Sequence, residues 1–87
     1  MYITKKNGKV VLYDTEKLIS SILKANSDTD EEELSRATAS YIANETFDRL
    51  TNEKDIITTQ DIRECVYDIL CDKNLPKTAQ LYMDFHK

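Results

Sequence analysis

The chain has 87 residues, of which 32% are charged, and its formal net charge is −4. A chain this short buries only about 60–65% of its unfolded surface, so we expect one domain over residues 1–87 with a modest core. An acidic total disfavours broad binding to nucleic acid, and no apolar run is long enough to cross a membrane, which favours a cytoplasmic location.

The charge is unevenly spread along the sequence. Residues 1–24 carry five lysines against Asp14 and Glu16, whereas residues 25–87 carry most of the acids. This asymmetry predicts a small, local site for a compact anion rather than an extended basic surface.

The first predicted element is a β-hairpin with strands at residues 2–6 and 9–13. Asn7-Gly8, which holds the only glycine, separates two short apolar-rich runs, and Asn-Gly is the strongest short-range signal for a hairpin. Both central residues of a two-residue type I′ turn need positive φ. We therefore expect a tight two-residue turn at this dipeptide.

This turn fixes the expected strand pairing. Ile3 would lie opposite Leu12, and Lys5 opposite Val10, so that these four side chains share one face of the hairpin. Val11 would then lie on the opposite face, away from Lys5.

Capping signals and apolar periodicity predict four helices after the hairpin. Their expected ranges are residues 15–25, 30–50 and 60–72, with a fourth helix starting at Pro76. The expected caps are Asp14 or Thr15, then Thr29 with Glu32, then Thr58 with Asp61. Ile56-Ile57 would form a short third strand. The predicted fold is α+β, with a small β-sheet (the hairpin plus the short third strand) capping a four-helix bundle.

Motifs for catalysis or metal binding are scarce. A single glycine excludes the glycine-rich phosphate loops, and the only histidine, His86, is next to last, which disfavours a Ser-His-Asp arrangement. Cys65 and Cys71 are spaced unlike any usual zinc site, so we expect two reduced thiols. The sequence favours a binding domain with no catalytic residues and no metal site.

Basic side chains and helix starts indicate where an anion would bind. Predicted helices begin near Thr15 and Thr59, each just after a predicted strand, and helix starts offer free N–H groups to anions. The side chains expected to gather at that sheet edge are Lys5, Lys6, Lys17 and Arg63. The alternative is that these are ordinary solvated side chains.

Three segments form a longer pattern. Residues 3–18 contain an apolar residue, Lys-Lys-Asn-Gly, an apolar strand ending in an aromatic residue, and Asp-x-x-Lys-Leu. Residues 57–62 run Ile-Thr-Thr-Gln-Asp-Ile, and residues 79–85 contain Ala-x-x-Tyr-x-x-Phe. In this order and spacing, they resemble the ATP-cone domain over nearly the whole chain.

The resemblance implies a regulatory domain that binds ATP or dATP, with Mg²⁺ carried by the nucleotide, between a β-sheet cap and a helix bundle. Such domains precede the catalytic part of ribonucleotide reductases, including anaerobic ones, and act there as allosteric sensors in DNA precursor synthesis. The implied partners are therefore that catalytic part and further copies of the chain in a homo-oligomer.

The resemblance also assigns residues to the nucleotide. Those implied to contact the phosphates or the ribose are Lys5, Lys6, Lys17, Thr59 and Arg63. Those implied to line the base are Ile3, Val11 and Ile62, while Asp14 would accept a hydrogen bond from the exocyclic amine of adenine. Lys6 replaces the arginine more common in the family, so a forked contact is lost.

Two other functions stay open. An acidic helical bundle can serve as a ligand-free protein-interaction module, with a surface on the second and fourth helices. ATP-cone domains also occur in a bacterial transcriptional repressor of reductase genes, behind a zinc ribbon that is not present in this sequence.

Overall fold

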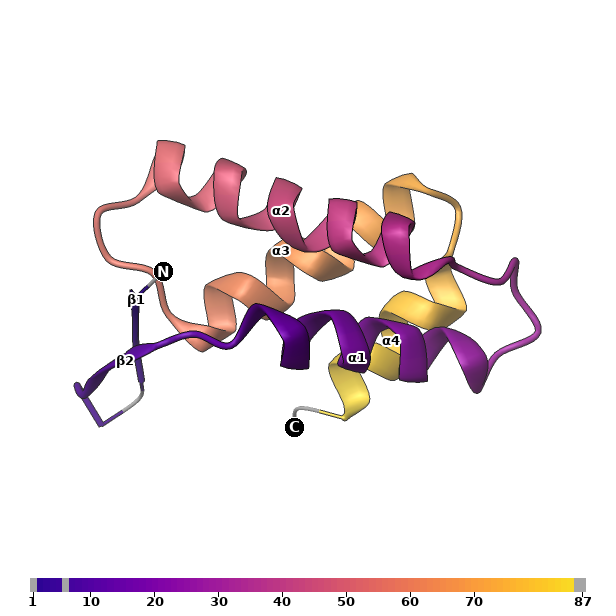
Figure 1. Ribbon diagram of the computed structural model, residues 1–87, viewed down its shortest axis with the longest axis horizontal. Coiled ribbons are helices and arrows are strands. Elements are labelled where there is room, and N and C mark those ends of the chain that lie inside the picture. The colour runs from indigo at the N-terminus through magenta and orange to yellow at the C-terminus, as the bar shows by residue number, and fades with distance from the viewer. Residues whose placement is uncertain (1, 6, 86–87) are drawn as a thin grey trace.

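A computed structural model describes residues 2–5 and 7–85. It contains two strands and four helices (Figure 1), which confirms the α+β class. In chain order they are β1 (Tyr2–Thr4), β2 (Val10–Leu12), α1 (Thr15–Ser27), α2 (Arg36–Glu53), α3 (Thr59–Asp72) and α4 (Pro76–Asp84). Within the described ranges, no helix is long and apolar enough to cross a membrane.

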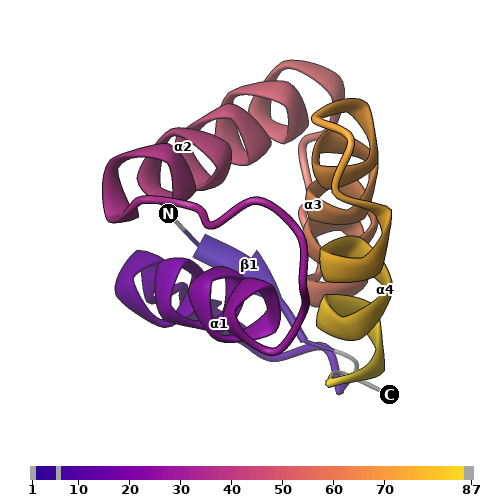
Figure 2. The same ribbon diagram turned by 90° about the vertical axis from the view of Figure 1, so that its right-hand side faces the viewer.

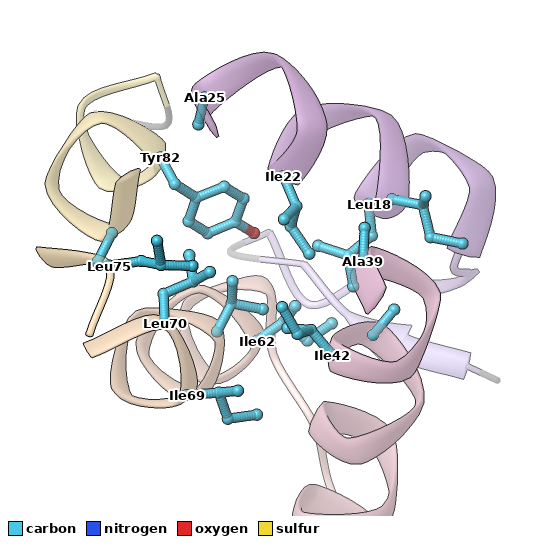
Figure 3. Packing of buried hydrophobic residues seen from close by; sticks show 14 of the residues in the cluster. Leu18, Ile22, Ala25, Ala39, Ile42, Ile62, Ile69, Leu70, Leu75 and Tyr82 are labelled. Atoms are coloured by element: carbon cyan, nitrogen blue, oxygen red, sulfur yellow. The ribbon is translucent and has the colours of Figure 1, made fainter. Parts of the chain in front are cut away.

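The four helices surround one core. Helix α1 packs against α2 and α4, and α3 packs against the same two helices (Figure 2). Apolar side chains from all four meet inside (Figure 3), and Ile22, Ile42, Ile62 and Tyr82 are each at most 1% exposed. The predicted four-helix bundle is therefore confirmed, and burial of this apolar surface is its main source of stability.

The hairpin lies at the end of the bundle where α1 and α3 begin (Figure 1). Ile3 is only 2% exposed and joins the core. The Thr4 N–H donates to the Ile57 carbonyl at 2.7 Å, and Thr4 forms an isolated parallel bridge with Thr58. The predicted third strand is wrong for the described residues, because α3 is capped at Thr58 and the chain turns into the helix after one bridge.

The turn of the hairpin also differs from its prediction. The Gly8 N–H donates to the Lys5 carbonyl and the Lys5 N–H donates to the Lys9 carbonyl, both at 2.9 Å. Among the residues of this turn that the structure describes, only Gly8 has positive φ, at 83°, whereas Asn7 accepts from the Lys9 N–H through its side chain. Lys5 and Lys9 therefore close the hairpin, and Gly8 takes the positive φ of a loop that ends in a glycine bulge, so the predicted two-residue turn is wrong.

One extra loop residue shifts the strand pairing by one position. Ile3 lies opposite Val11, and Thr4 lies opposite Val10. Because side chains alternate along a strand, this shift brings Val11 to the buried face of Ile3 and turns Val10 and Leu12 outward. The predicted pairing of Ile3 with Leu12 is wrong, and Val10 and Leu12 are 61% and 66% exposed.

Three of the four predicted helix starts are confirmed. Asp14 caps α1, Thr58 and Asp61 form a capping box on α3, and Pro76 begins α4. Helix α2 instead begins at Arg36, with Ser35 as its cap, so the predicted start at residue 30 is wrong.

The Thr29–Glu32 segment has a different role. The Glu31 carboxylate accepts from the N–H groups of Lys77 and Thr78, at 3.0 and 2.6 Å, and from the Thr78 hydroxyl at 2.8 Å. These donors belong to the first turn of α4, whose preceding residue offers no side-chain cap. Glu31 therefore caps α4, which is remote in sequence, rather than a helix that begins beside it.

Asn26, at the end of α1, holds the following loop in place. Its side-chain amide donates to the Glu32 carbonyl at 2.9 Å and to the Thr78 hydroxyl at 3.2 Å, and its oxygen accepts from the Leu34 N–H at 2.8 Å. Asn26 is only 3% exposed, and these bonds satisfy a buried polar group that would otherwise be costly.

Replacing Glu31 by Gln tests the remote cap. Partial loss of water around Glu31 opposes ionisation, but the bonds from Lys77 and Thr78 outweigh it and hold the pKa of Glu31 below its usual value. Such bonds stabilise the fold above the unfolded pKa, about 4.3, and are lost as pH falls through the lower folded pKa. We expect Glu31→Gln to lower the melting temperature at pH 7 and to lose less stability on acidification.

Glu33→Gln is the matched control, since Glu33 is exposed in the same loop. Melting curves between about pH 3 and pH 7 cover the relevant window. Equal behaviour of the two variants would contradict the role assigned to Glu31.

Candidate functional site

A cavity of about 420 Å³ lies between the hairpin, the first turns of α1 and α3, and the side of α4. Its volume is in the range of small-molecule sites. The residues that line it are Ile3, Lys5, Val11, Leu12, Tyr13, Asp14, Lys17, Ser21, Thr59, Arg63 and Tyr82.

The inner face of the hairpin forms an apolar wall of this cavity. Ile3 and Val11 lie opposite each other on that face, a consequence of the observed register. Tyr13 follows, and its ring meets the Phe47 ring of α2 edge to face, with centroids 5.7 Å apart. The wall therefore presents a surface on which a flat, apolar group can pack.

Three cations border the same cavity. Lys5 comes from the hairpin, Lys17 from the first turn of α1 and Arg63 from α3. In residues 2–5 and 7–85, none of the three takes part in an ion pair, and the one carboxylate lining the cavity is Asp14. In a chain of net negative charge, this is a local positive field that suits a polyanion.

The other cavities lack this imbalance. Lys77, at a cavity beside α4, pairs with Asp30 at 2.9 Å, and Lys54, at another cavity, pairs with Asp61 at 2.8 Å. A further cavity, near the start of α2, has two glutamates and Lys73. The charge pattern, rather than size, distinguishes the cavity under the hairpin.

The two helix starts contribute differently to the site. The Asp14 carboxylate accepts from the N–H groups of Glu16 and Lys17, at 3.0 and 3.4 Å. The expected free N–H groups at the start of α1 are therefore already bonded, and that prediction is wrong for these two residues. At α3, Thr58 accepts from the Asp61 N–H at 3.1 Å, and Thr59, the first helical residue, lines the cavity.

Two phenols add neutral polar groups. Tyr82 is only 1% exposed, and its ring lies between α1 and α3 (Figure 3). Burial raises the pKa of Tyr82, and burial likewise raises the pKa of Tyr13 although the Arg63 charge opposes it. Both hydroxyls therefore keep their protons at neutral pH and can act as hydrogen-bond donors.

Comparison with known families decides what kind of domain this is. A model of the ATP cone domain matches residues 1–87, the whole chain. The chain belongs to the ATP-cone family. A search of curated proteins finds no match. ATP-cone domains bind adenine nucleotides and are regulatory rather than catalytic, so this chain is a nucleotide-binding regulatory domain.

Most residues expected from sequence to bind the nucleotide line the cavity of this ATP-cone domain. They are Ile3, Lys5, Val11, Asp14, Lys17, Thr59 and Arg63. Ile62 lies in the core at 1% exposure and is not one of the lining residues. Lys6 lies outside the described residues.

Sequence reasoning missed four lining residues, namely Leu12, Tyr13, Ser21 and Tyr82. Ser21 lies one turn after Lys17, and its hydroxyl donates to the Lys17 carbonyl at 2.8 Å. Residues four apart lie on the same face of a helix, so the position of Lys17 could have pointed to Ser21. Tyr82 is the tyrosine of the Ala-x-x-Tyr-x-x-Phe motif at residues 79–85. Its large apolar ring indicates a core residue more directly than a residue that lines a site.

Adjacent serines on α1 allow a steric test of the cavity. Ser21 lines it, whereas Ser20 is exposed and does not. We expect Ser21→Phe to fill the cavity and to raise the dissociation constant for ATP by about tenfold or more, equivalent to ~1.4 kcal/mol. Ser20→Phe, the matched control, should bind like the unchanged protein in calorimetry, and equal weakening in both variants would place the nucleotide elsewhere.

Proposed function

We propose that this ATP-cone domain senses ATP and dATP for the catalytic part of a ribonucleotide reductase. The observation that carries the proposal is the cavity in which Lys5, Lys17 and Arg63, none in an ion pair within the described ranges, face an apolar wall. An adenine nucleotide combines a flat base with a compact polyanion, which is the complement of this arrangement.

In the proposed pose, the base packs on Ile3 and Val11 and the phosphates lie toward Lys5, Lys17 and Arg63. Lysines act as point charges for phosphate, and the guanidinium of Arg63 can make a forked contact. Thr59, at the start of α3, adds the positive end of a helix dipole. Mg²⁺ would arrive bound to the phosphates.

Two further sequence assignments are kept in this proposal. Lys6, next in sequence to Lys5, would join the phosphate ligands. Ile62 would support the base from the core, next in sequence to Arg63.

Regulation follows from binding linkage. A nucleotide that binds one quaternary arrangement better shifts the population toward that arrangement by its difference in affinity. ATP and dATP differ only by the ribose 2′-hydroxyl, and a site that hydrogen-bonds a hydroxyl can discriminate strongly. The uncharged polar side chains that line the cavity are Tyr13, Ser21, Thr59 and Tyr82, and the contact to that hydroxyl would come from one of them.

A charge-matched pair of double variants tests the phosphate site. Lys5→Ala with Lys17→Ala removes two cations from the cavity, one on the hairpin and one on α1. Lys9→Ala with Lys24→Ala removes two cations from the same two elements but outside the cavity. We expect the first pair to weaken ATP binding roughly ten- to a hundredfold in calorimetry and the second to leave it almost unchanged.

Two results would count against the proposal. Similar losses in both double variants would mean that only net charge matters. Absence of a melting-temperature shift in the unchanged protein at millimolar ATP or dATP would favour the ligand-free interaction module instead.

Asp14 allows a test of base recognition that spares the helix cap. Asparagine caps helices as well as aspartate does, but its side chain can donate as well as accept. Adenine presents an amine where guanine presents a carbonyl oxygen. We therefore expect Asp14→Asn to keep the melting temperature and to reduce the preference for ATP over GTP, measured as a ratio of dissociation constants. An unchanged ratio would remove Asp14 from the base site.

A further inference from the structure

Strand β2 has one open edge. β1 lies between β2 and the Ile57–Thr58 segment, because Thr4 bonds to Ile57 on the side away from β2. In the part of the chain that the structure describes, the sheet order is β1–β2 and β2 has no further strand beside it. Open edges present backbone groups that can pair with another strand.

The hydrogen-bond pattern identifies which backbone groups face that edge. Lys5 and Lys9 are joined by a ladder bond, and bonded and non-bonded pairs alternate along an antiparallel ladder. The Ile3–Val11 pair is therefore the next bonded pair. The N–H and C=O groups of Val10 and Leu12 consequently point away from β1, toward the open edge.

The side chains beside this edge are apolar and exposed. Tyr2, Val10 and Leu12 are 69%, 61% and 66% exposed, and Tyr2 lies directly opposite Leu12. Leu12 touches the cavity rim, but most of its surface faces outward. Exposed apolar side chains on an open edge favour strand addition, and Tyr2 extends this apolar surface onto β1.

The charges flanking β2 are self-complementary. Lys9 precedes the strand and Asp14 follows it after one residue. In an antiparallel pair of two β2 strands centred on Val11, Val10 of each copy lies opposite Leu12 of the other. The basic end of each strand then lies beside the acidic end of its partner, whereas a parallel pair would set like charges side by side.

We propose that two copies of this chain pair antiparallel through β2, about a twofold axis at Val11. The outward backbone groups of Val10 and Leu12 would bond to Leu12 and Val10 of the second copy, and the two hairpins would form one four-stranded sheet. The arrangement is closed, since each copy uses the same edge. It is a small interface, so it belongs to the weak and reversible class, and it borders the cavity, which Val11, Leu12 and Asp14 also line.

Amide exchange measured by NMR on the full chain tests the bonding pattern directly. Between roughly 20 µM and 1 mM protein, we expect the amides of Val10 and Leu12 to exchange several-fold more slowly as concentration rises. The Val11 amide, already bonded to β1, should not change with concentration. Sedimentation over the same range should show a monomer–dimer equilibrium. A monomer at every concentration, or no selective protection of Val10 and Leu12, overturns the proposal.

Two substitutions at one position separate backbone pairing from side-chain packing. Val10→Pro removes an outward N–H and leaves the bonds to β1, and proline is tolerated on such edges, so dimerisation should be lost. Val10→Thr keeps the N–H and the branched shape, so dimerisation should persist. Ile56→Lys changes an exposed apolar side chain away from the β2 edge and should also leave the dimer intact. If Ile56→Lys abolishes the dimer while folded Val10→Pro retains it, the copies meet through their faces and the edge proposal is wrong.

Discussion

One backbone hydrogen bond, from Thr4 to the carbonyl of Ile57, ties the hairpin to the helices. A lone hairpin is marginal in water, and this one has strands of only three residues. The Thr4 bond and the burial of Ile3 hold it against the starts of α1 and α3. Because the hairpin forms one wall of the cavity, the proposed nucleotide site depends on this attachment, and so does the exposure of the β2 edge.

The distribution of ion pairs separates lysines that join segments of the fold from the cations at the cavity. Lys54 and Lys77 have carboxylate partners, and these pairs join segments that the fold brings together. Lys5, Lys17 and Arg63 have none in residues 2–5 and 7–85. Three cations and one carboxylate line the cavity, so it carries a net positive charge that a bound polyanion would neutralise.

Local signals predicted much of the fold, and remote contacts decided the rest. Asp14, Thr58 with Asp61, and Pro76 act within one helical turn, so their caps follow from sequence. Asn-Gly suits both two- and three-residue loops, so the dipeptide alone leaves the register open by one residue. The Thr29–Glu32 segment resembled a local cap, but the donors that Glu31 accepts from lie 46 and 47 residues away. The same one-residue error in the loop misplaced Val11, while the ATP-cone pattern still assigned Val11 to the cavity.

Helix α1 links two places that are far apart in the molecule. It has 13 residues and is therefore about 20 Å long. Lys17 and Ser21 line the cavity near one end, and Asn26 bonds to the α1–α2 loop and to Thr78 of α4 near the other. A helix behaves as a stiff rod at this length, so a small tilt at the cavity becomes a displacement of the distant loop. The buried amide of Asn26 ties that loop and the start of α4 to the same helix, so a change in its tilt would carry both with it.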